Sequence, residues 1–350
     1  MNDLAINWLI EQINLQQSNS LNQLWVVDEN IGDQWRSLPS MNLAVICNRF
    51  DVAHQMKTLF SQAEFSDFDF SSIADNSLDT VFYRISKEKA VTHQVINEAY
   101  RCLKHDGLFI VAGYKNEGIK TYLEKVGTHW NTKVTQKKLR DIYTALIAKP
   151  MQHQEHHLLD SSSYTTLRNI HTDEFPIFSK PGQFGWNKLD AGSKLLLEAL
   201  NTIPHELSGE VLDLGCGYGY LSLEASRLPR MSTISGWTLT DNNAAAILSA
   251  TANCEHYHLS ARVIPDDCAM SIQERFDLIL CNPPFHQGFD VENNLTDKFL
   301  ASAAKHLNPN GLCLFVVNQF IPLERKALPH FNKIEVLIND GKFKVVRLSL

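Results

Sequence analysis

One short stretch restricts the fold of this chain more than any other. Residues 210–214 form an apolar run that leads into the turn Gly215-Cys216-Gly217-Tyr218-Gly219, and a helical pattern starts at Tyr220. Glycine permits the positive φ angles of a tight turn, and it lets a ligand lie against the backbone. A strand, a glycine turn and a helix in this order predict one unit of an α/β sheet that binds a ligand at its carboxyl end.

The rest of the second half continues this alternation. Further strands are expected at 234–240, 261–264, 276–281 and 312–317, with helices near 244–252 and 296–306. Such alternation predicts a mostly parallel sheet covered by helices on both faces. Two more apolar runs, 333–338 and 342–348, are joined by Asn339-Asp340-Gly341 and predict a hairpin that adds one antiparallel strand.

The first half repeats this plan in a weaker form. Residues 98–111 align with 302–315 when Leu103 is matched with Leu307. In the same way, residues 78–83 match 276–281, and residues 24–28 match 210–214. No glycine turn follows Asp28 and no proline pair follows Tyr83, so this half lacks the groups that would bind a cofactor. We therefore expect a degenerate copy over 1–155, a polar linker over 156–172 and a catalytic domain over 173–350.

Composition agrees with two globular domains. The chain has 350 residues, of which 44% are hydrophobic and 20% charged. Its net charge is −7 and neither half is basic, so any contact with nucleic acid must be a local patch. The amino terminus does not read as a signal peptide and no apolar run is long enough to span a membrane, so a cytoplasmic location is expected.

The residues that could bind a metal are few. The seven cysteines are scattered and form no Cys-x-x-Cys pair, which argues against a disulfide framework and a zinc site. His153, His156 and His157 have a spacing that could bind a metal on a helix, but they lie in the polar stretch 151–168 with no acidic or cysteine partner at motif spacing. We expect a polar linker there and no metal.

Acidic residues end three successive predicted strands. Asp213 can hold the amino-acid portion of a cofactor, Asp241 can accept both hydroxyls of a ribose, and Asp267 is placed to meet an adenine amino group. A dinucleotide site would need a glycine where Tyr220 stands, so S-adenosylmethionine is favoured. The predicted cofactor residues are Asp213, Gly215, Cys216, Gly217, Asp241, Asn242, Asp267, Cys268 and Asn282.

The run Asn282-Pro283-Pro284-Phe285 follows the fourth strand and indicates the chemistry. An exocyclic amino nitrogen is a poor nucleophile because its lone pair is delocalised into the ring. The Asn282 side-chain oxygen and the Pro283 carbonyl can accept its two hydrogens, while Phe285 stacks on the base. These three are the predicted catalytic residues, and His286 could be a base or a substrate contact. The motif leaves adenine, cytosine, guanine and glutamine amides open as acceptors.

Several blocks together resemble the ribosomal RNA small subunit methyltransferase C family. They are Pro181-Gly182-Gln183-Phe184 with residues 189–197, then residues 211–217, then Asn282-Pro283-Pro284-Phe285-His286-Gln287-Gly288, and finally Gly341-Lys342-Phe343-Lys344-Val345. The resemblance implies two tandem Rossmann-like class I methyltransferase domains with seven-stranded, mostly parallel sheets, the first degenerate. It also implies that the segment from Phe184 to Ser193 packs over the cofactor, and that the first domain helps to fold the second or to hold RNA.

The same resemblance implies methylation of the exocyclic N2 of a guanine in small-subunit (16S) ribosomal RNA. We expect the assembled 30S subunit as the substrate and a monomeric enzyme. The expected substrate contacts are Phe184, Lys188, Phe285, His286, Lys342 and Arg347, with Lys133, Lys137, Lys138, Arg140 and Lys344 as further basic candidates.

Other functions stay open at this point. A related family acts on large-subunit ribosomal RNA with the same loop motif, although the tail at 341–344 favours the small-subunit type. A methyltransferase for protein glutamine or DNA adenine would more usually carry a tyrosine at position 285, and a DNA-reading enzyme should carry a basic insert. The alternative outside enzymes is an RNA-binding pseudo-methyltransferase.

Overall fold

The computed structural model describes residues 3–16, 22–28, 31–151, 158–172, 174–204, 206–284 and 289–350. The chain divides into two compact units, Met1–Thr166 and Leu167–Leu350. This division falls inside the predicted linker at 156–172. Leu159 and Tyr164 are buried in the core of the first unit, so the part of this segment around them packs as part of that unit.

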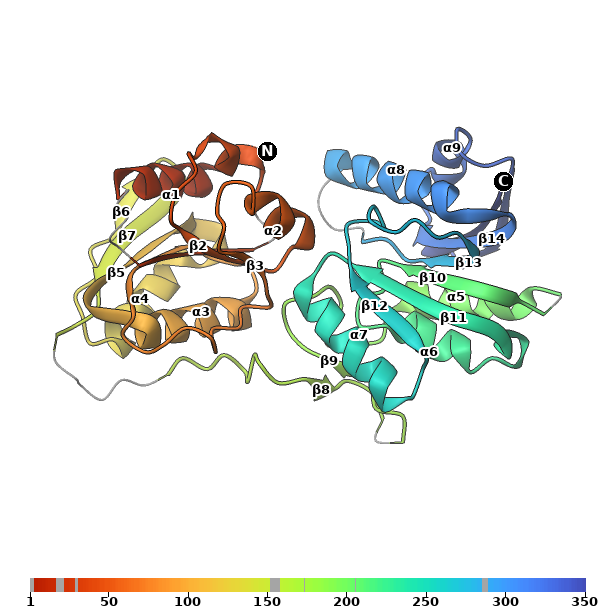
Figure 1. Ribbon diagram of the computed structural model, residues 1–350, viewed down its shortest axis with the longest axis horizontal. Helices are drawn as coiled ribbons and strands as arrows, with labels where there is room; N and C mark the ends of the chain where they lie inside the picture. Colours follow the sequence, from red (N-terminus) through yellow and green to blue (C-terminus); the bar gives the residue numbers. More distant parts are fainter. Residues whose placement is uncertain are drawn as a thin grey trace. The chain divides into compact units, whose positions relative to one another are not determined.

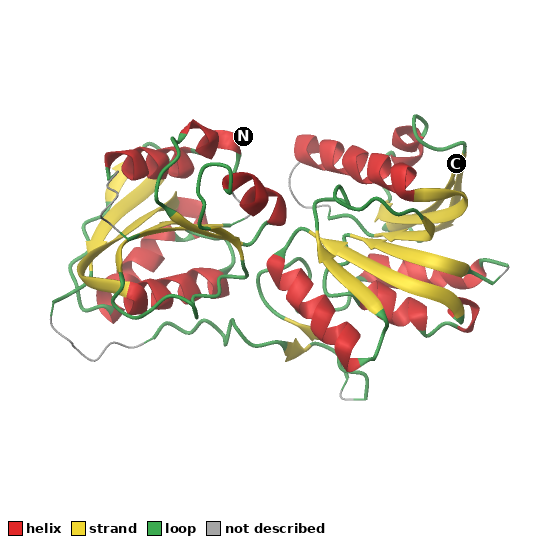
Figure 2. Ribbon diagram, in the orientation of Figure 1, coloured by secondary structure: helices red, strands yellow, loops and turns green. Residues whose placement is uncertain are grey.

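The second unit is a seven-stranded sheet between two layers of helices (Figures 1 and 2). Its strands are β10 (Ser208–Leu214), β11 (Thr233–Asp241), β12 (Ala261–Pro265), β13 (Phe276–Cys281), β14 (Leu307–Asn318), β15 (Lys333–Asn339) and β16 (Phe343–Ser349). Their order is β12-β11-β10-β13-β14-β16-β15. β16 runs antiparallel to the other six strands, and it lies between β14 and the edge strand β15. The predicted sheet with one antiparallel strand is confirmed.

Helices cover both faces of this sheet. They are α5 (Ala191–Thr202), α6 (Tyr220–Ser226), α7 (Ala244–His256), α8 (Phe289–His306) and α9 (Leu323–Ala327), with a short 3₁₀ turn η3 (Pro229–Met231). One core joins α5, α6 and α7 to one face, and a second core joins α8 and α9 to the other (Figure 1). Successive strand residues point to opposite faces, so most of the strands contribute to both cores.

The first unit has the same strand order, β3-β2-β1-β4-β5-β7-β6. Its strands are β1 (Gln23–Val27), β2 (Ala44–Cys47), β3 (Ala63–Phe65), β4 (Leu78–Arg84), β5 (Leu103–Tyr114), β6 (Lys137–Leu139) and β7 (Ile142–Ala148). Its helices are α1 (Leu4–Leu15), α2 (Phe50–Met56), α3 (Lys89–Cys102) and α4 (Ile119–His129), with 3₁₀ turns η1 (Asp33–Ser37) and η2 (Lys115–Glu117). The predicted repetition of one architecture is confirmed.

The alignment of Leu103 with Leu307 holds in detail. Leu103 begins β5 and Leu307 begins β14, and both strands have 12 residues. The match of residues 24–28 with 210–214 was wrong by two positions. Trp25 pairs with Phe82 in the first unit, and Asp213 pairs with Leu280 in the second. Since Phe82 corresponds to Leu280, Trp25 corresponds to Asp213, and Leu24 therefore corresponds to Leu212 rather than to Glu210. Apolar strand residues resemble one another at every second position, so only the pairing of strands fixes such a register.

Near its start, the second unit also has a small antiparallel sheet of two strands, β8 (Arg168–Asn169) and β9 (Phe178–Ser179). Among the described residues, no helix combines the length and the apolarity that a membrane crossing requires.

Candidate active site

The carboxyl ends of β11, β10 and β13 lie side by side, because these three strands are neighbours in the sheet and run parallel. Asp241, Asp213 and Asn282 are at or directly after these ends. Parallel sheets bind ligands at this edge, since the loops there diverge and leave backbone groups exposed. The structure thus brings together the residues for which the sequence predicted a common site.

The glycine turn after β10 has the backbone that its sequence predicted. Gly215, Gly217 and Gly219 have φ angles of 82°, 55° and 81°. The amides of Gly215 and Cys216 both donate to the Thr240 carbonyl at 2.9 Å, which ties the turn to β11. A Cβ atom at Gly217 would meet no atom within 4 Å, so this residue faces open space. The turn offers a ligand an unobstructed stretch of backbone.

Asp213 is buried, at 1% exposure, and its Oδ2 accepts a 2.6 Å hydrogen bond from the Ser222 hydroxyl. Burial, with the nearby Asp241 carboxylate, raises the pKa of Asp213 to about 7, while the Ser222 hydrogen bond opposes this shift. A cationic group placed beside Asp213 would therefore favour its ionised form. This arrangement suits the ammonium of an amino-acid moiety.

Asp241 is held by backbone amides at the tip of β11. Its Oδ2 accepts from Gly217 N and its Oδ1 from Asn243 N, both at 2.9 Å. Burial raises the pKa of Asp241, and these amides act in the opposite direction. Each carboxylate oxygen can accept a further hydrogen bond, so the group is fixed in place and still able to receive hydroxyl donors.

The third acid has a partner that the sequence did not indicate. Asp267 forms an ion pair with Lys298 of α8. Next to it, Cys268 has a φ of 54°, and its carbonyl accepts from the Ser302 hydroxyl at 2.6 Å. Burial raises the pKa of Cys268 to about 12, so its thiol is neutral and apolar in character. Asn242, the other predicted cofactor residue here, is half-buried directly after Asp241.

The predicted reacting centre follows β13. The Asn282 Nδ2 donates to Asp190 Oδ2 at 2.7 Å and to Ser193 Oγ at 2.9 Å. Within the part of the chain that the structure describes, neither Asn282 Oδ1 nor the Pro283 carbonyl accepts a hydrogen bond. Both predicted acceptors are thus available for donors from outside. Phe285 and His286 lie outside the described residues.

Residues 180–190 connect the two sides of this site. The Gly182 carbonyl accepts from Asn243 Nδ2 at 2.8 Å beside the tip of β11, and Asp190 binds Asn282 beyond the tip of β13. The segment therefore crosses the carboxyl edge of the sheet between these points. Its Phe184 is 52% exposed. Such a course agrees with the expectation that this segment packs over a ligand.

The basic residues proposed for substrate contact differ in their surroundings. Lys188 and Lys342 are exposed, and Lys342 follows the hairpin turn beside the end of β14. Lys344 is bound to Glu324 in a pair that is mostly buried on the lysine side. Arg347 lies 4.0 Å from Glu335 and opposite Leu314, in the middle of the sheet. Lys133, Lys137, Lys138 and Arg140 are exposed in the first unit.

Sequence reasoning missed two features of the site. Asp190 and Ser193 bind Asn282 although they lie about ninety residues away in the chain. The resemblance had included both residues, and the Asp-x-x-Ser pattern indicates a helix start, but neither signal indicated a contact with Asn282. Phe320 is 83% exposed in the loop after β14, at the same edge of the sheet. A single phenylalanine after a strand has no sequence signature of exposure.

The first unit has lost the corresponding groups. Strand register places Trp25 where the second unit has Asp213, and Cys47 where it has Asp241. Asp67 stands at the position of Asp267, but it accepts a 2.6 Å hydrogen bond from the buried Tyr164 hydroxyl. Two acids are therefore missing and the third is occupied from within the chain.

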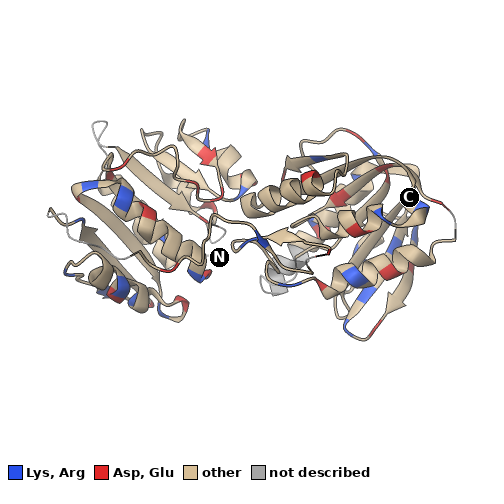
Figure 3. Ribbon diagram, turned by 90° about the horizontal axis from the view of Figure 1, so that it is seen from below, with Lys and Arg blue, Asp and Glu red and all other residues tan. Residues whose placement is uncertain are grey.

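Cationic and anionic residues are interspersed along both ribbons (Figure 3). In the described part of the chain, no cluster of three or more histidine, cysteine or acidic side chains is arranged to hold a metal ion.

Comparison with known proteins agrees with this geometry. The methyltransferase small domain family matches residues 174–347. A ribosomal RNA small subunit methyltransferase C from Hamiltonella defensa is 34% identical over 276 residues, which cover 78% of this chain and 77% of that protein.

The chain belongs to the ribosomal RNA small subunit methyltransferase C family.

Two further members extend the comparison. The ribosomal RNA small subunit methyltransferase C of Haemophilus influenzae strain PittEE is 38% identical over 183 residues, about half of either chain. The 16S rRNA N2 methyltransferase of T. thermophilus, solved with AdoMet and guanosine, aligns with a TM-score of 0.78 over 99% of this chain and 92% of that one. Because the sequence identity is only 24%, the comparison with the T. thermophilus structure supports the fold alone, and the alignment covers both units.

Proposed function

We propose that this chain transfers a methyl group from S-adenosylmethionine to the exocyclic N2 of a guanine in small-subunit ribosomal RNA. Family membership supports this activity, because the relatives are named for small-subunit ribosomal RNA methylation. One observation in the structure carries the proposal: Asn282 Oδ1 and the Pro283 carbonyl have no partner among the described residues, at the sheet edge that also bears the glycine turn, the buried Asp213 and the half-buried Asp241.

The residues present fit S-adenosylmethionine. Asp213 suits the ammonium of its amino-acid portion, Asp241 its ribose hydroxyls, and the open backbone at Gly217 leaves space for its chain. When bound, the cofactor supplies a methyl group on a positively charged sulfur. Neutral thiols at Cys216 and Cys268 add no negative charge to the walls.

The protein acts on the base by position rather than by strong acid–base chemistry. Asn282 Oδ1 and the Pro283 carbonyl accept the two hydrogens of the guanine amino group, which directs the nitrogen lone pair to the methyl donor. Fixed acceptors need no reorganisation as positive charge develops on the nitrogen. The proton then leaves to water. Phe285 stacks on the base and fixes its plane.

Exposed aromatic rings and lysines at the same edge form the RNA contact. Phe184 and Phe320 offer surfaces on which unpaired bases can stack, while Lys188 and Lys342 reach phosphates. Because the net charge is −7, this contact is a local one and suits a structured particle better than free RNA. We infer that the substrate is the assembled 30S subunit and that the enzyme acts as a monomer in the cytoplasm.

The test combines one variant with three substrates. Labelled S-adenosylmethionine is supplied with small subunits, large subunits or free ribosomal RNA from cells that lack the protein. We expect label only in small subunits, and N2-methylguanine after digestion to nucleosides. Asn282→Ala should lower the rate by about a hundredfold or more while cofactor binding, measured by calorimetry, is retained. Label in adenosine, in protein or in large subunits would contradict the proposal, and failure to methylate any substrate would favour a pseudo-enzyme.

A further inference from the structure

The amide of Asn282 is held in one orientation. Both of its N–H donors are used, on Asp190 Oδ2 at 2.7 Å and on Ser193 Oγ at 2.9 Å. A carboxylate can only accept, so a rotation of the amide by half a turn would place Asn282 Oδ1 against a carboxylate oxygen. That orientation loses the hydrogen bond to Asp190 and sets two oxygens in contact, whereas the Ser193 hydroxyl could donate to Oδ1. Asp190 is thus the group that sets the orientation. The observed orientation is therefore strongly favoured, and it leaves Oδ1 as the outward group.

Asp190 is itself fixed by the start of α5. It is the N-cap of this helix, and the same Oδ2 that binds Asn282 accepts from Ser193 N at 2.8 Å. Gly192 packs directly against the pair. A Cβ on it would lie 3.0 Å from Asp190 Oδ2 and 3.5 Å from the terminal atoms of the Asn282 amide. A larger residue at position 192 would therefore crowd both groups.

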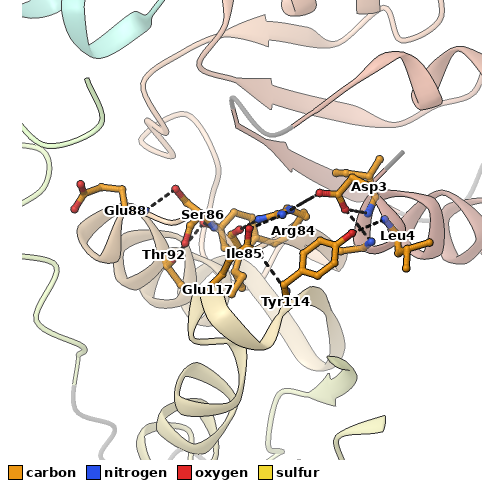
Figure 4. A network of polar contacts seen from close by, with 12 residues as sticks. Asp3, Leu4, Arg84, Ile85, Ser86, Glu88, Thr92, Tyr114 and Glu117 are labelled. Carbon is orange, nitrogen blue, oxygen red and sulfur yellow. Dashed lines mark hydrogen bonds and ion pairs between the residues drawn. The ribbon is translucent and has the colours of Figure 1, made fainter. Parts of the chain in front are cut away.

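The first unit has the corresponding contact between a helix N-cap and a strand end, but different side chains form it. Asp3 is the N-cap of α1, and its Oδ2 accepts from Arg84 Nη2 at 2.9 Å (Figure 4). Arg84 ends β4 at the position that corresponds to Asn282, and Glu117 accepts from it at 2.8 Å. A guanidinium is a donor only, so it can accept no hydrogen from a base. The second unit keeps the connection between helix cap and strand tip, but with a residue that has an acceptor left over.

We propose that Asp190 and Ser193 are positioning residues for methyl transfer, which hold the Asn282 amide so that its Oδ1 faces the amino group of the substrate. The inference rests on the proposed function. It adds a second layer to the reacting centre: α5 supplies the acceptors that decide which atom of Asn282 the substrate meets.

Three variants of the full chain separate positioning from helix capping. Ser193→Ala removes one acceptor and keeps the backbone amide that Asp190 caps. Asp190→Ser retains a good N-cap residue, but its hydroxyl is too short to reach Asn282. Asp190→Asn keeps an oxygen that can accept from both Ser193 N and Asn282. As a matched control, Glu88→Ser exchanges a capping carboxylate at α3 in the first unit.

The measurements are the single-turnover rate of methyl transfer to small subunits, the cofactor dissociation constant and the melting temperature. We expect Asp190→Ser to lower the rate by about 10- to 100-fold and Ser193→Ala by about 3- to 10-fold, since they remove a charged and a neutral hydrogen bond. Asp190→Asn should recover most of the rate lost in Asp190→Ser. Cofactor affinity should be unchanged in all, and Glu88→Ser should match the unmodified chain.

Each result has a defined meaning. Normal rates in Asp190→Ser and Ser193→Ala, with Asn282→Ala inactive, would overturn the positioning role and leave the proposed function intact. Normal transfer by Asn282→Ala would instead overturn the proposed acceptor role itself. If Asp190→Ser does not fold, Ser193→Ala decides, because it leaves the cap in place. A loss of rate that only follows a fall in melting temperature or in cofactor affinity would also contradict positioning.

Discussion

The acid at the end of β10 is the residue whose ionisation matters most for the site. Asp213 is buried, and its pKa is raised to about 7 mainly by that burial. Below pH 7 the free protein carries a proton on Asp213. This proton must leave if the ammonium of the cofactor is to meet a carboxylate, so the binding of S-adenosylmethionine is coupled to proton release.

Cofactor affinity should therefore depend on pH. The dissociation constant is expected to rise about fivefold as the pH falls from 7 to 6, and to level off above pH 8, because one proton is displaced well below the pKa and none well above it. Calorimetry across this range in buffers of different ionisation enthalpy measures both the affinity and the proton released. Asp213→Asn should bind more weakly and show a flat profile. A flat profile in the unmodified chain would show that Asp213 is not the titrating contact.

At the scale of elements, the turn between β10 and α6 connects two strands and a helix through its backbone amides. Gly217 has a positive φ and its amide donates to Asp241, while the space above its Cα is open. A side chain at this position would strain the turn and enter the space assigned to the cofactor.

Gly217→Ala should accordingly weaken cofactor binding by about tenfold or more, with a loss of roughly 1 kcal/mol in the free energy of unfolding. Gly341→Ala is the matched control, since Gly341 also has a positive φ, 85°, and open space around its Cα, but lies in the β15–β16 turn. Thermal unfolding should respond similarly in both variants, and cofactor titration only in Gly217→Ala. An equal loss of affinity in both would mean that strain, rather than contact, explains the effect.

At the scale of the whole molecule, two units with one strand order differ in what their strand tips carry. The first unit has Trp25 and Cys47 where the second has Asp213 and Asp241, and its Asp67 is bonded to Tyr164. Trp25 is fully buried, so its indole fills space in the core rather than lining a site. The same topology therefore supports a packed core in one unit and a binding edge in the other.

The full chain should bind one molecule of S-adenosylmethionine, not two. Calorimetric titration of the purified protein gives the stoichiometry, and Gly217→Ala should weaken the only transition observed. A second transition that persists in Gly217→Ala would place a cofactor in the first unit and contradict the reading of its strand tips.

Much of this protein could be predicted from local sequence patterns. The glycine turn, the acids at the strand ends and the run from Asn282 to Pro284 are each defined by neighbours in the chain, because a strand followed by a turn is a local arrangement. The repetition of the two halves was also detectable, since both retain the helix end, glycine and apolar strand around Leu103 and Leu307.

Contacts between distant residues were decided only by the tertiary structure. The equivalence of Trp25 in the first unit with Asp213 in the second depends on which strands pair and in which register. The orientation that leaves Asn282 Oδ1 without a partner among the described residues depends on the helix N-cap at Asp190. The sequence determined which groups are at each strand tip, because backbone conformation is local. Folding decided which of their atoms are still unbonded, because a hydrogen-bond partner can come from any part of the chain.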